Sequence, residues 1–207
     1  MTYKIITKLL VNRLKPILTQ IISQEQSAFV GGRIISDNVL VAQEIFHSMG
    51  FHMEEGEMMA VKLDMERAYD LMGWFFIQKV LMKFGFHQKF IGLIMACIRE
   101  PDFAVLVIGS PTELFRSMTG LWQGDPLSPC LFIIGAEVFV RTGSSSGRLT
   151  GVQIGTNGES VSQLAYADDC LLFLKSVNKE AVVIQDIVQD YCRVSGQKVN
   201  LAAEYKV

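Results

Sequence analysis

The spacing of apolar side chains changes several times along the chain, and each change marks the boundary of a predicted element. Residues 3–22 carry apolar side chains at helical spacing, and Pro16 is predicted to bend or divide this helix. The same spacing predicts further helices over residues 39–49, 74–84, 90–98, 131–140 and 178–194. The Ser/Gly-rich residues 143–147 are predicted to form a flexible connection.

Continuous apolar runs predict two buried strand regions. Residues 59–65 form one such run, and Asp64 stands at its end. Residues 161–174 are apolar on both sides of Asp168 and Asp169, a pattern typical of two strands that meet in a tight acidic turn. Both regions therefore place carboxylates at strand ends.

Two further segments complete the predicted order of elements. A hairpin is expected over residues 103–118, turning through Gly109, Ser110 and Pro111. A short strand is expected from Lys198. The order strand, helices, hairpin, helix, hairpin, helix, strand predicts an α+β fold in which helices pack on one face of an antiparallel sheet.

Composition agrees with a globular chain and leaves the nature of its partners open. Half of the 207 residues are hydrophobic, which provides a sizeable core and argues against disorder. The formal net charge of -2 argues against nucleic-acid binding if charge is averaged. The first 35 residues are locally basic, however, with Lys4, Lys8, Arg13, Lys15 and Arg33 against Glu25. A solvated amphipathic helix explains this stretch as well as a binding face does.

The spacing of the cysteines and the length of the apolar runs indicate the cellular environment of the protein. The four cysteines stand far apart and lack the spacing of a zinc site, which predicts a reduced intracellular environment. No apolar run reaches the roughly 20 residues that a membrane span needs. We expect an intracellular protein of the nucleus and cytoplasm, without a signal peptide or transmembrane segment.

Asp64 is the first candidate for chemistry. A carboxylate at the end of a buried strand is costly unless it is paired or binds a cation. A single aspartate at such a position is nevertheless more often a cap or turn residue. Asp64 alone therefore does not decide the function.

Asp168 and Asp169 form the second candidate. Adjacent carboxylates inside an apolar hairpin repel each other and are poorly hydrated, so a divalent cation is their natural partner. A solvated Asp-Asp turn is the alternative, which the apolar flanking strands weaken. If the strand ending at Asp64 lies beside this turn, the carboxylates converge on a site suited to two Mg²⁺ ions about 3.5–4 Å apart, the usual arrangement for phosphoryl transfer.

The third candidate is the loop of residues 120–129, Gly-Leu-Trp-Gln-Gly-Asp-Pro-Leu-Ser-Pro. Its glycines let the backbone approach a ligand closely, and its prolines stiffen the chain before a helix. A Gly/Pro loop is weak evidence by itself. Placed between the strand that ends at Asp64 and the Tyr-Ala-Asp-Asp sequence at residues 166–169, it becomes a strong signal.

Together these motifs resemble the reverse transcriptase domain of non-LTR retrotransposons, of the LINE type found in plants. The matching stretches are residues 26–38 (early fingers motif), 64–70 (motif A), 120–129 (motif B), 166–169 (motif C) and 195–200 (motif D region). The resemblance extends over essentially the whole chain. It implies a polymerase palm plus partial helical fingers, with the thumb absent.

The resemblance also implies domain boundaries. Residues 1–58 would be partial fingers, and residues 59–207 would be the palm, with an interposed fingers-type segment around residues 75–118. Under this interpretation the chain is a truncated part of a longer polyprotein, whose other fingers, thumb and further domains would be its partners. An RNA template, a DNA primer and a dNTP would be its substrates, and no membrane is involved.

Residue roles follow from the same resemblance. Asp64, Asp168 and Asp169 would be catalytic and would bind two Mg²⁺ ions, with Mn²⁺ as a substitute. Tyr69 would be the steric gate against a ribose 2′-OH, although an ordinary core tyrosine remains the alternative.

Three further residues are expected to contact substrates. Gln123 and Gly124 would line the pocket for the incoming nucleotide and its template base. Arg33 would help to hold the template or the fingers. The implied reaction joins a primer 3′-hydroxyl to the α-phosphate of a dNTP by two-metal nucleotidyl transfer.

Several positions depart from the family pattern. Trp122 stands where a basic residue is usual, and the lysine expected after Asn200 is absent, with Ala203 and Glu204 there instead. Lys198 or Lys206 would have to replace it. A catalytically inactive transposon-derived fragment, which keeps the fold and binds nucleic acid or protein, is therefore the alternative. A nucleotide cyclase on a similar fold would leave the loop of residues 120–129 unexplained.

Overall fold

The computed structural model describes residues 2–52, 58–145, 149–153, 160–175, 177–200 and 204–205. Two helices come first, α1 (Thr2–Ile21) and α2 (Ile35–His52). α1 begins and ends one residue before the predicted range of residues 3–22, and α2 is longer than the predicted residues 39–49 at both ends. Pro16 lies inside α1, which continues through it.

One antiparallel sheet forms the centre of the molecule. Its strands are hydrogen-bonded in the order β6-β7-β1-β8, and β9 also pairs with β1. The strands are β1 (Met59–Met65), β6 (Gln163–Tyr166), β7 (Asp169–Leu174), β8 (Val199–Asn200) and β9 (Glu204–Tyr205). The first strand in the sequence is thus the central one, because segments from the end of the chain pair on both of its sides.

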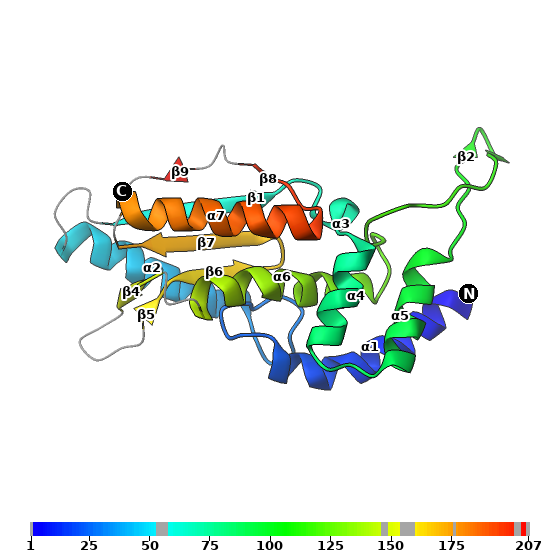
Figure 1. Ribbon diagram of the computed structural model, residues 1–207, viewed down its shortest axis with the longest axis horizontal. Coiled ribbons are helices and arrows are strands. Elements are labelled where there is room, and N and C mark those ends of the chain that lie inside the picture. The colour runs from blue at the N-terminus through cyan, green and yellow to red at the C-terminus, as the bar shows by residue number, and fades with distance from the viewer. Residues whose placement is uncertain are drawn as a thin grey trace.

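The remaining helices follow the predicted order. They are α3 (Ala68–Leu71), α4 (Trp74–Lys83), α5 (Gln88–Arg99), α6 (Ser128–Ser145) and α7 (Val177–Ser195). Figure 1 shows α7 running along the sheet. Two ribbons, β2 (Leu106–Val107) with β3 (Ser110–Pro111) and β4 (Val152–Gln153) with β5 (Ser160–Val161), form separate two-stranded sheets.

Alternation along the strands divides the core into two clusters. Leu63 of β1 and Cys170 and Leu172 of β7 belong to the larger cluster, which α1, α4, α5, α6 and α7 complete. Ala60 of β1 and Phe173 of β7 point to the opposite face, where α2 covers them. The main core confirms the α+β fold, and α2 adds cover to part of the second face.

Two local predictions were wrong. The hairpin predicted to turn through Gly109, Ser110 and Pro111 turns one residue earlier, because Ser110 and Pro111 are themselves paired in β3. Ile108 (φ 49°) and Gly109 (φ 82°) make the turn with left-handed backbone. The flexible connection predicted over residues 143–147 starts as the last turn of α6, which runs to Ser145, and residues 146–148 lie outside the described residues.

Candidate functional site

Asp64 and Asp169 are direct neighbours across two antiparallel strands. The register pairs Asp64 of β1 with Asp169 of β7, which places their Cα atoms about 4.5–5.5 Å apart. Directly opposed residues project from the same face of a sheet. Both residues are exposed, so two carboxylates share one open surface at the end of the central strand.

The same face carries a cation. The Lys62 ammonium nitrogen lies 2.9 Å from Oδ1 of Asp169, and Lys62 stands two residues before Asp64 on β1. This ion pair explains how two like charges are tolerated side by side, because the ammonium offsets their repulsion.

Asp168 occupies the turn between β6 and β7, directly after Ala167. Ala167 has a φ of 56°, in the left-handed region that a side chain disfavours. Asp168 is electrostatically coupled to Tyr69: burial raises the pKa of Tyr69 to about 12, and the negative charge of Asp168 adds to that increase. The turn therefore lies close enough to the start of α3 for the charge of Asp168 to act on the Tyr69 hydroxyl.

The three carboxylates occupy the same end of the sheet without forming a closed metal cage. Among the residues the structure describes, no group of three or more His, Cys, Asp or Glu side chains is arranged to hold a metal ion. Carboxylate oxygens are nevertheless the ligands that Mg²⁺ prefers. The donor set thus suits a hard cation, and the assignment of Asp64, Asp168 and Asp169 as ligands stays a prediction.

Tyr69 is held from both its ring and its backbone. Its ring stacks on Phe132 of α6 with centroids 4.9 Å apart and planes 18° apart. Its carbonyl oxygen accepts a hydrogen bond of 2.7 Å from the Leu121 amide. The side chain is half-buried, which leaves one side of it available at the site.

The loop of residues 120–129 packs directly against the segment that follows β1. The Gly120 amide donates to the Met72 carbonyl at 3.0 Å, and the Trp74 indole nitrogen donates to the Gly120 carbonyl at 2.7 Å. Gly120 has a φ of 89°, and a Cβ atom there would lie 2.6 Å from the Asp70 carbonyl oxygen. A glycine is required at this position because the two backbones touch.

Gln123 stands between two cavities. One, of about 790 Å³, is also lined by Gly124, Trp122 and the start of α1. The other, of about 520 Å³, is also lined by Asp70 and Trp122. The Trp122 ring, which replaces the expected basic residue, stacks on Phe103. Gln123 and Gly124 therefore line open space, and their assignment to a nucleotide pocket stays a prediction.

The segment of residues 195–200 closes the other side of Asp64. Asn200 of β8 is paired with Asp64, and the Glu66 amide donates to the Lys198 carbonyl at 2.8 Å. Gln197 is buried and its side-chain amide donates to the Ala68 carbonyl at 2.7 Å. Lys198 is exposed, whereas Ala203 and Lys206 lie outside the described residues.

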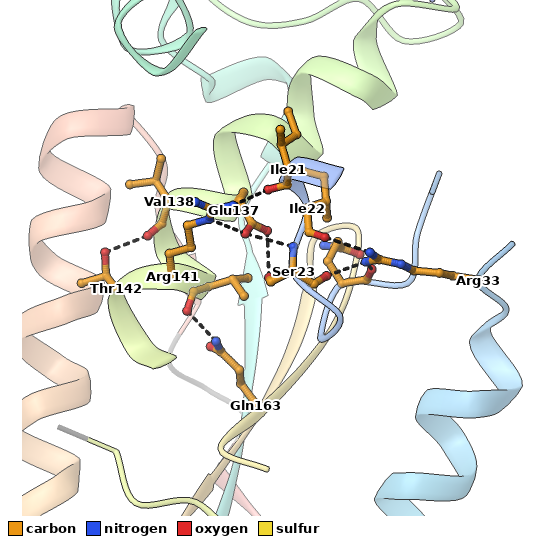
Figure 2. Close-up of polar contacts among 11 residues, drawn as sticks. Ile21, Ile22, Ser23, Arg33, Glu137, Val138, Arg141, Thr142 and Gln163 are labelled. Atoms are coloured by element: carbon orange, nitrogen blue, oxygen red, sulfur yellow. Dashed lines mark hydrogen bonds and ion pairs between the residues drawn. The ribbon is translucent and has the colours of Figure 1, made fainter. Parts of the chain in front are cut away.

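Arg33 is engaged by the backbone of its own loop. Its guanidinium donates hydrogen bonds to the carbonyl oxygens of Ile22, Ser23 and Gln26, as Figure 2 shows for the labelled residues. These contacts give Arg33 a structural role at the end of α1. Its assignment as a template-holding residue stays a prediction.

The same loop is fastened to α6 by a buried carboxylate. Glu137 accepts hydrogen bonds of 3.0 Å from both the amide and the hydroxyl of Ser23, and it is paired with Arg141 at 2.8 Å (Figure 2). Burial raises the pKa of Glu137, and the bonds from Arg141 and Ser23 oppose that increase. Sequence reasoning missed this cluster, although a single Glu inside the apolar run of α6 was the available signal.

Sequence reasoning also left Gln26 without a role. Gln26 is 1% exposed, and its side chain bonds to the backbone of Ala167 in the acidic turn. No pattern distinguishes it in the sequence, because it stands in the polar stretch Ser-Gln-Glu-Gln-Ser of residues 23–27.

Comparison with known proteins decides the family. Residues 1–202 match the family described as reverse transcriptase (RNA-dependent DNA polymerase). The chain belongs to the reverse transcriptase family. A transposon TX1 protein of Xenopus laevis is 30% identical over 200 residues, which cover 96% of this chain and 15% of that protein. The Pol polyprotein of a type-1 R2 retrotransposable element of Popillia japonica is 33% identical over 115 residues, 54% of this chain and 18% of that protein.

Solved telomerase structures share the fold. The structure of telomerase from Candida albicans, in complex with a fragment of telomeric RNA, has a TM-score of 0.68 at 13% identity, covering 98% of this chain and 35% of that chain. The chain thus spans less than a fifth of the two transposon proteins and about a third of the telomerase chain. The family generally uses divalent metal ions. Within the described ranges, no helix is long and apolar enough to cross a membrane.

Proposed function

We propose that this reverse transcriptase domain extends a primer 3′-hydroxyl with dNTPs on an RNA template. The observation that carries the proposal is the cross-strand pairing of Asp64 with Asp169, with Asp168 in the adjoining turn. That arrangement brings acidic residues from distant parts of the sequence to one end of the sheet, which supports a shared cation site there.

Asp64, Asp168 and Asp169 would hold two divalent cations, Mg²⁺ with Mn²⁺ as a substitute. Such ions, when bound, lower the pKa of the attacking hydroxyl and stabilise the negative charge of the leaving pyrophosphate. The exposed shared face of Asp64 and Asp169 leaves room for substrate oxygens to complete the coordination. Lys62 would give up its contact with Asp169 as the cation enters.

Tyr69 and Gln123 would shape the nucleotide pocket. The Tyr69 ring, held flat on Phe132, would occupy the space of a ribose 2′-OH and so favour deoxynucleotides. Gln123 and Gly124 would contact the incoming nucleotide and its template base from the cavities that they line. Base selection would come from template pairing, so the protein needs mainly shape and backbone contacts.

The organisation proposed for the chain is partial fingers over residues 1–58 and palm over residues 59–207, with a fingers-type insertion around residues 75–118. In Figure 1, α1 and α5 lie together at one end of the molecule, from which the β2–β3 ribbon projects. This end would meet the template and the incoming nucleotide. The longer relatives carry further segments, which would supply additional contacts to the RNA and the primer.

Primer extension tests the proposal. The full 207-residue chain is incubated with poly(rA), oligo(dT), labelled dTTP and Mg²⁺, and we expect template-dependent extension that Asp168→Ala abolishes. Asp186→Ala, an exposed aspartate on α7, is the matched control and should extend normally. If wild-type protein showed a folded circular dichroism spectrum and still did not extend the primer, the catalytically inactive alternative would be favoured.

A further inference from the structure

Ala167 occupies a strained position at the centre of the candidate site. A residue with a side chain in the left-handed region costs about 1–2 kcal/mol relative to ordinary backbone. Such a conformation persists only where the surroundings hold it in place. Because Ala167 directly precedes Asp168, the plane of the peptide between them sets the direction in which the Asp168 carboxylate leaves the turn.

The side-chain amide of Gln26 holds both polar groups of that residue. Its Oε1 accepts a hydrogen bond of 3.0 Å from the Ala167 amide, and its Nε2 donates to the Ala167 carbonyl at 3.3 Å. The same Oε1 accepts from the Ala28 amide at 2.9 Å. These two bonds fix the orientation of Ala167, because rotation of the peptide plane before or after it would break one of them.

Burial makes this contact stronger than an ordinary surface bond. Gln26 is 1% exposed, so water does not replace a lost partner, and an unsatisfied buried group costs about 1–3 kcal/mol. The contact joins positions 141 residues apart in the sequence. It therefore ties the acidic turn to the loop after α1.

Gln26 is itself rigidly placed from two directions. Its carbonyl accepts a hydrogen bond of 2.6 Å from Arg33, within the cluster shown in Figure 2. Its neighbours line the free edge of β6: the Ala165 amide donates to the Glu25 carbonyl at 2.8 Å, and the Ser27 amide donates to the Ala165 carbonyl at 3.1 Å. Asn38 of α2 adds a bond of 3.0 Å to the same Ala165 carbonyl.

We propose that Gln26 is a positioning residue for nucleotidyl transfer, whose buried amide locks Ala167 so that Asp168 faces the cation-binding surface. The role given to Asp168 rests on the proposed function. The two hydrogen bonds from Gln26 to Ala167, called the lock below, are a property of the fold. Loss of the amide should therefore change cation use more than it changes dNTP binding.

The first test uses Gln26→Met, which preserves length and removes all three hydrogen bonds. Gln163→Met is the matched control, since Gln163 is also buried on β6 and its amide bonds to the Val140 carbonyl, away from the turn. Gln26→Met should raise the Mg²⁺ concentration for half-maximal extension about tenfold and lower kcat about tenfold. Its KM for dTTP should stay within about twofold of the wild-type value. Gln163→Met should leave all three constants within about twofold.

The second test does not depend on activity. Hydrogen exchange of the Ala167 amide, resolved by NMR of the full chain, should speed up about tenfold in Gln26→Met relative to wild type, and should stay unchanged in Gln163→Met. Equal exchange rates at Ala167 in all three proteins would overturn the lock. If exchange speeds up but wild type never extends a primer, the lock stands and the proposed polymerase activity fails. If Gln26→Met and Gln163→Met showed the same fall in kcat and the same rise in Mg²⁺ requirement, Gln26 would only stabilise the fold.

Discussion

The Lys62 ammonium and the Asp169 carboxylate form an ion pair of 2.9 Å on the face that Asp64 shares. The two side chains are 45% and 57% exposed, so the pair adds at most about 1 kcal/mol to stability. Its importance is local, because it places a positive charge where the proposed function requires a cation. Lys62 and a metal ion therefore compete for one carboxylate.

Substitution of Lys62 tests this competition. Lys62→Met should lower the Mg²⁺ concentration for half-maximal primer extension by about threefold to tenfold, because the repulsion between ammonium and metal ion is removed. The free energy of unfolding should change by less than about 1 kcal/mol. Lys79→Met on α4, where the ammonium lies over the Phe75 ring, is the control and should leave the Mg²⁺ dependence unchanged. A rise in the Mg²⁺ requirement of Lys62→Met would show that the lysine assists the reaction instead.

Gly120→Ala should destabilise the chain by about 2 kcal/mol or more. The new Cβ would lie 2.6 Å from the Asp70 carbonyl oxygen, and the φ of 89° is strained for any side chain. Gly124→Ala is the matched control, because its φ of 86° is similar but its Cβ would meet nothing within 4 Å. Urea unfolding should show a loss of only about 1 kcal/mol for Gly124→Ala. Equal losses would contradict the close contact at Gly120.

Tyr69 tests nucleotide selection. Tyr69→Val removes the ring that stacks on Phe132 and should raise the incorporation of ribonucleotides relative to deoxynucleotides by about tenfold or more. Tyr69→Phe keeps the ring and should select like wild type. Single-nucleotide incorporation with matched rNTP and dNTP concentrations measures both ratios, and an unchanged ratio in Tyr69→Val would make this tyrosine an ordinary core residue.

The same tyrosine predicts an alkaline effect on stability. Its pKa is raised from 10.0 to about 12, first by burial and then by the charge of Asp168. A raised folded pKa contributes stability that is fully present below pH 10 and is lost as the pH rises through about 12. Between these values the free energy of unfolding should fall more steeply for wild type than for Tyr69→Phe. Parallel pH profiles in urea unfolding would contradict the pKa increase.

Arg33→Lys separates a structural role from a template-holding one. A lysine cannot make the forked contacts that Arg33 makes with three carbonyl oxygens, so the free energy of unfolding should fall by about 1–3 kcal/mol. Arg193→Lys, in an exposed ion pair with Asp190, should change it by less than about 0.5 kcal/mol. Unchanged stability of Arg33→Lys together with weaker RNA binding would favour the template-holding role.

The elements could be predicted where local pattern determines them. The apolar run of residues 59–65 gives a strand in the sequence and in the structure with the same bounds, because both faces of β1 are covered over most of its length. The hairpin turn at Ile108 was missed because a β-branched residue in the left-handed region contradicts ordinary preference.

The sequence singles out the acidic members of the candidate site but not the contacts through which Gln26 and Arg33 support it. Asp64 and Asp168 stand out because a carboxylate at the end of an apolar strand is costly unless it is paired or binds a cation. Gln26 and Arg33 act through hydrogen bonds to main-chain atoms, which any sequence offers at every position. The 141-residue separation between Gln26 and Ala167 means that only the folded chain reveals their contact.

Iron-mediated cleavage measures the cation site directly, without requiring turnover. Fe²⁺ replaces Mg²⁺ in the presence of primer, template and dTTP, and ascorbate with peroxide then cuts the backbone beside the bound ion. We predict cuts next to residue 64 and next to residues 168–169 in the same sample, suppressed by excess Mg²⁺ and lost in Asp168→Asn. Cuts confined to other segments, or a pattern that Asp168→Asn leaves unchanged, would contradict a shared cation site at the end of β1 and β7.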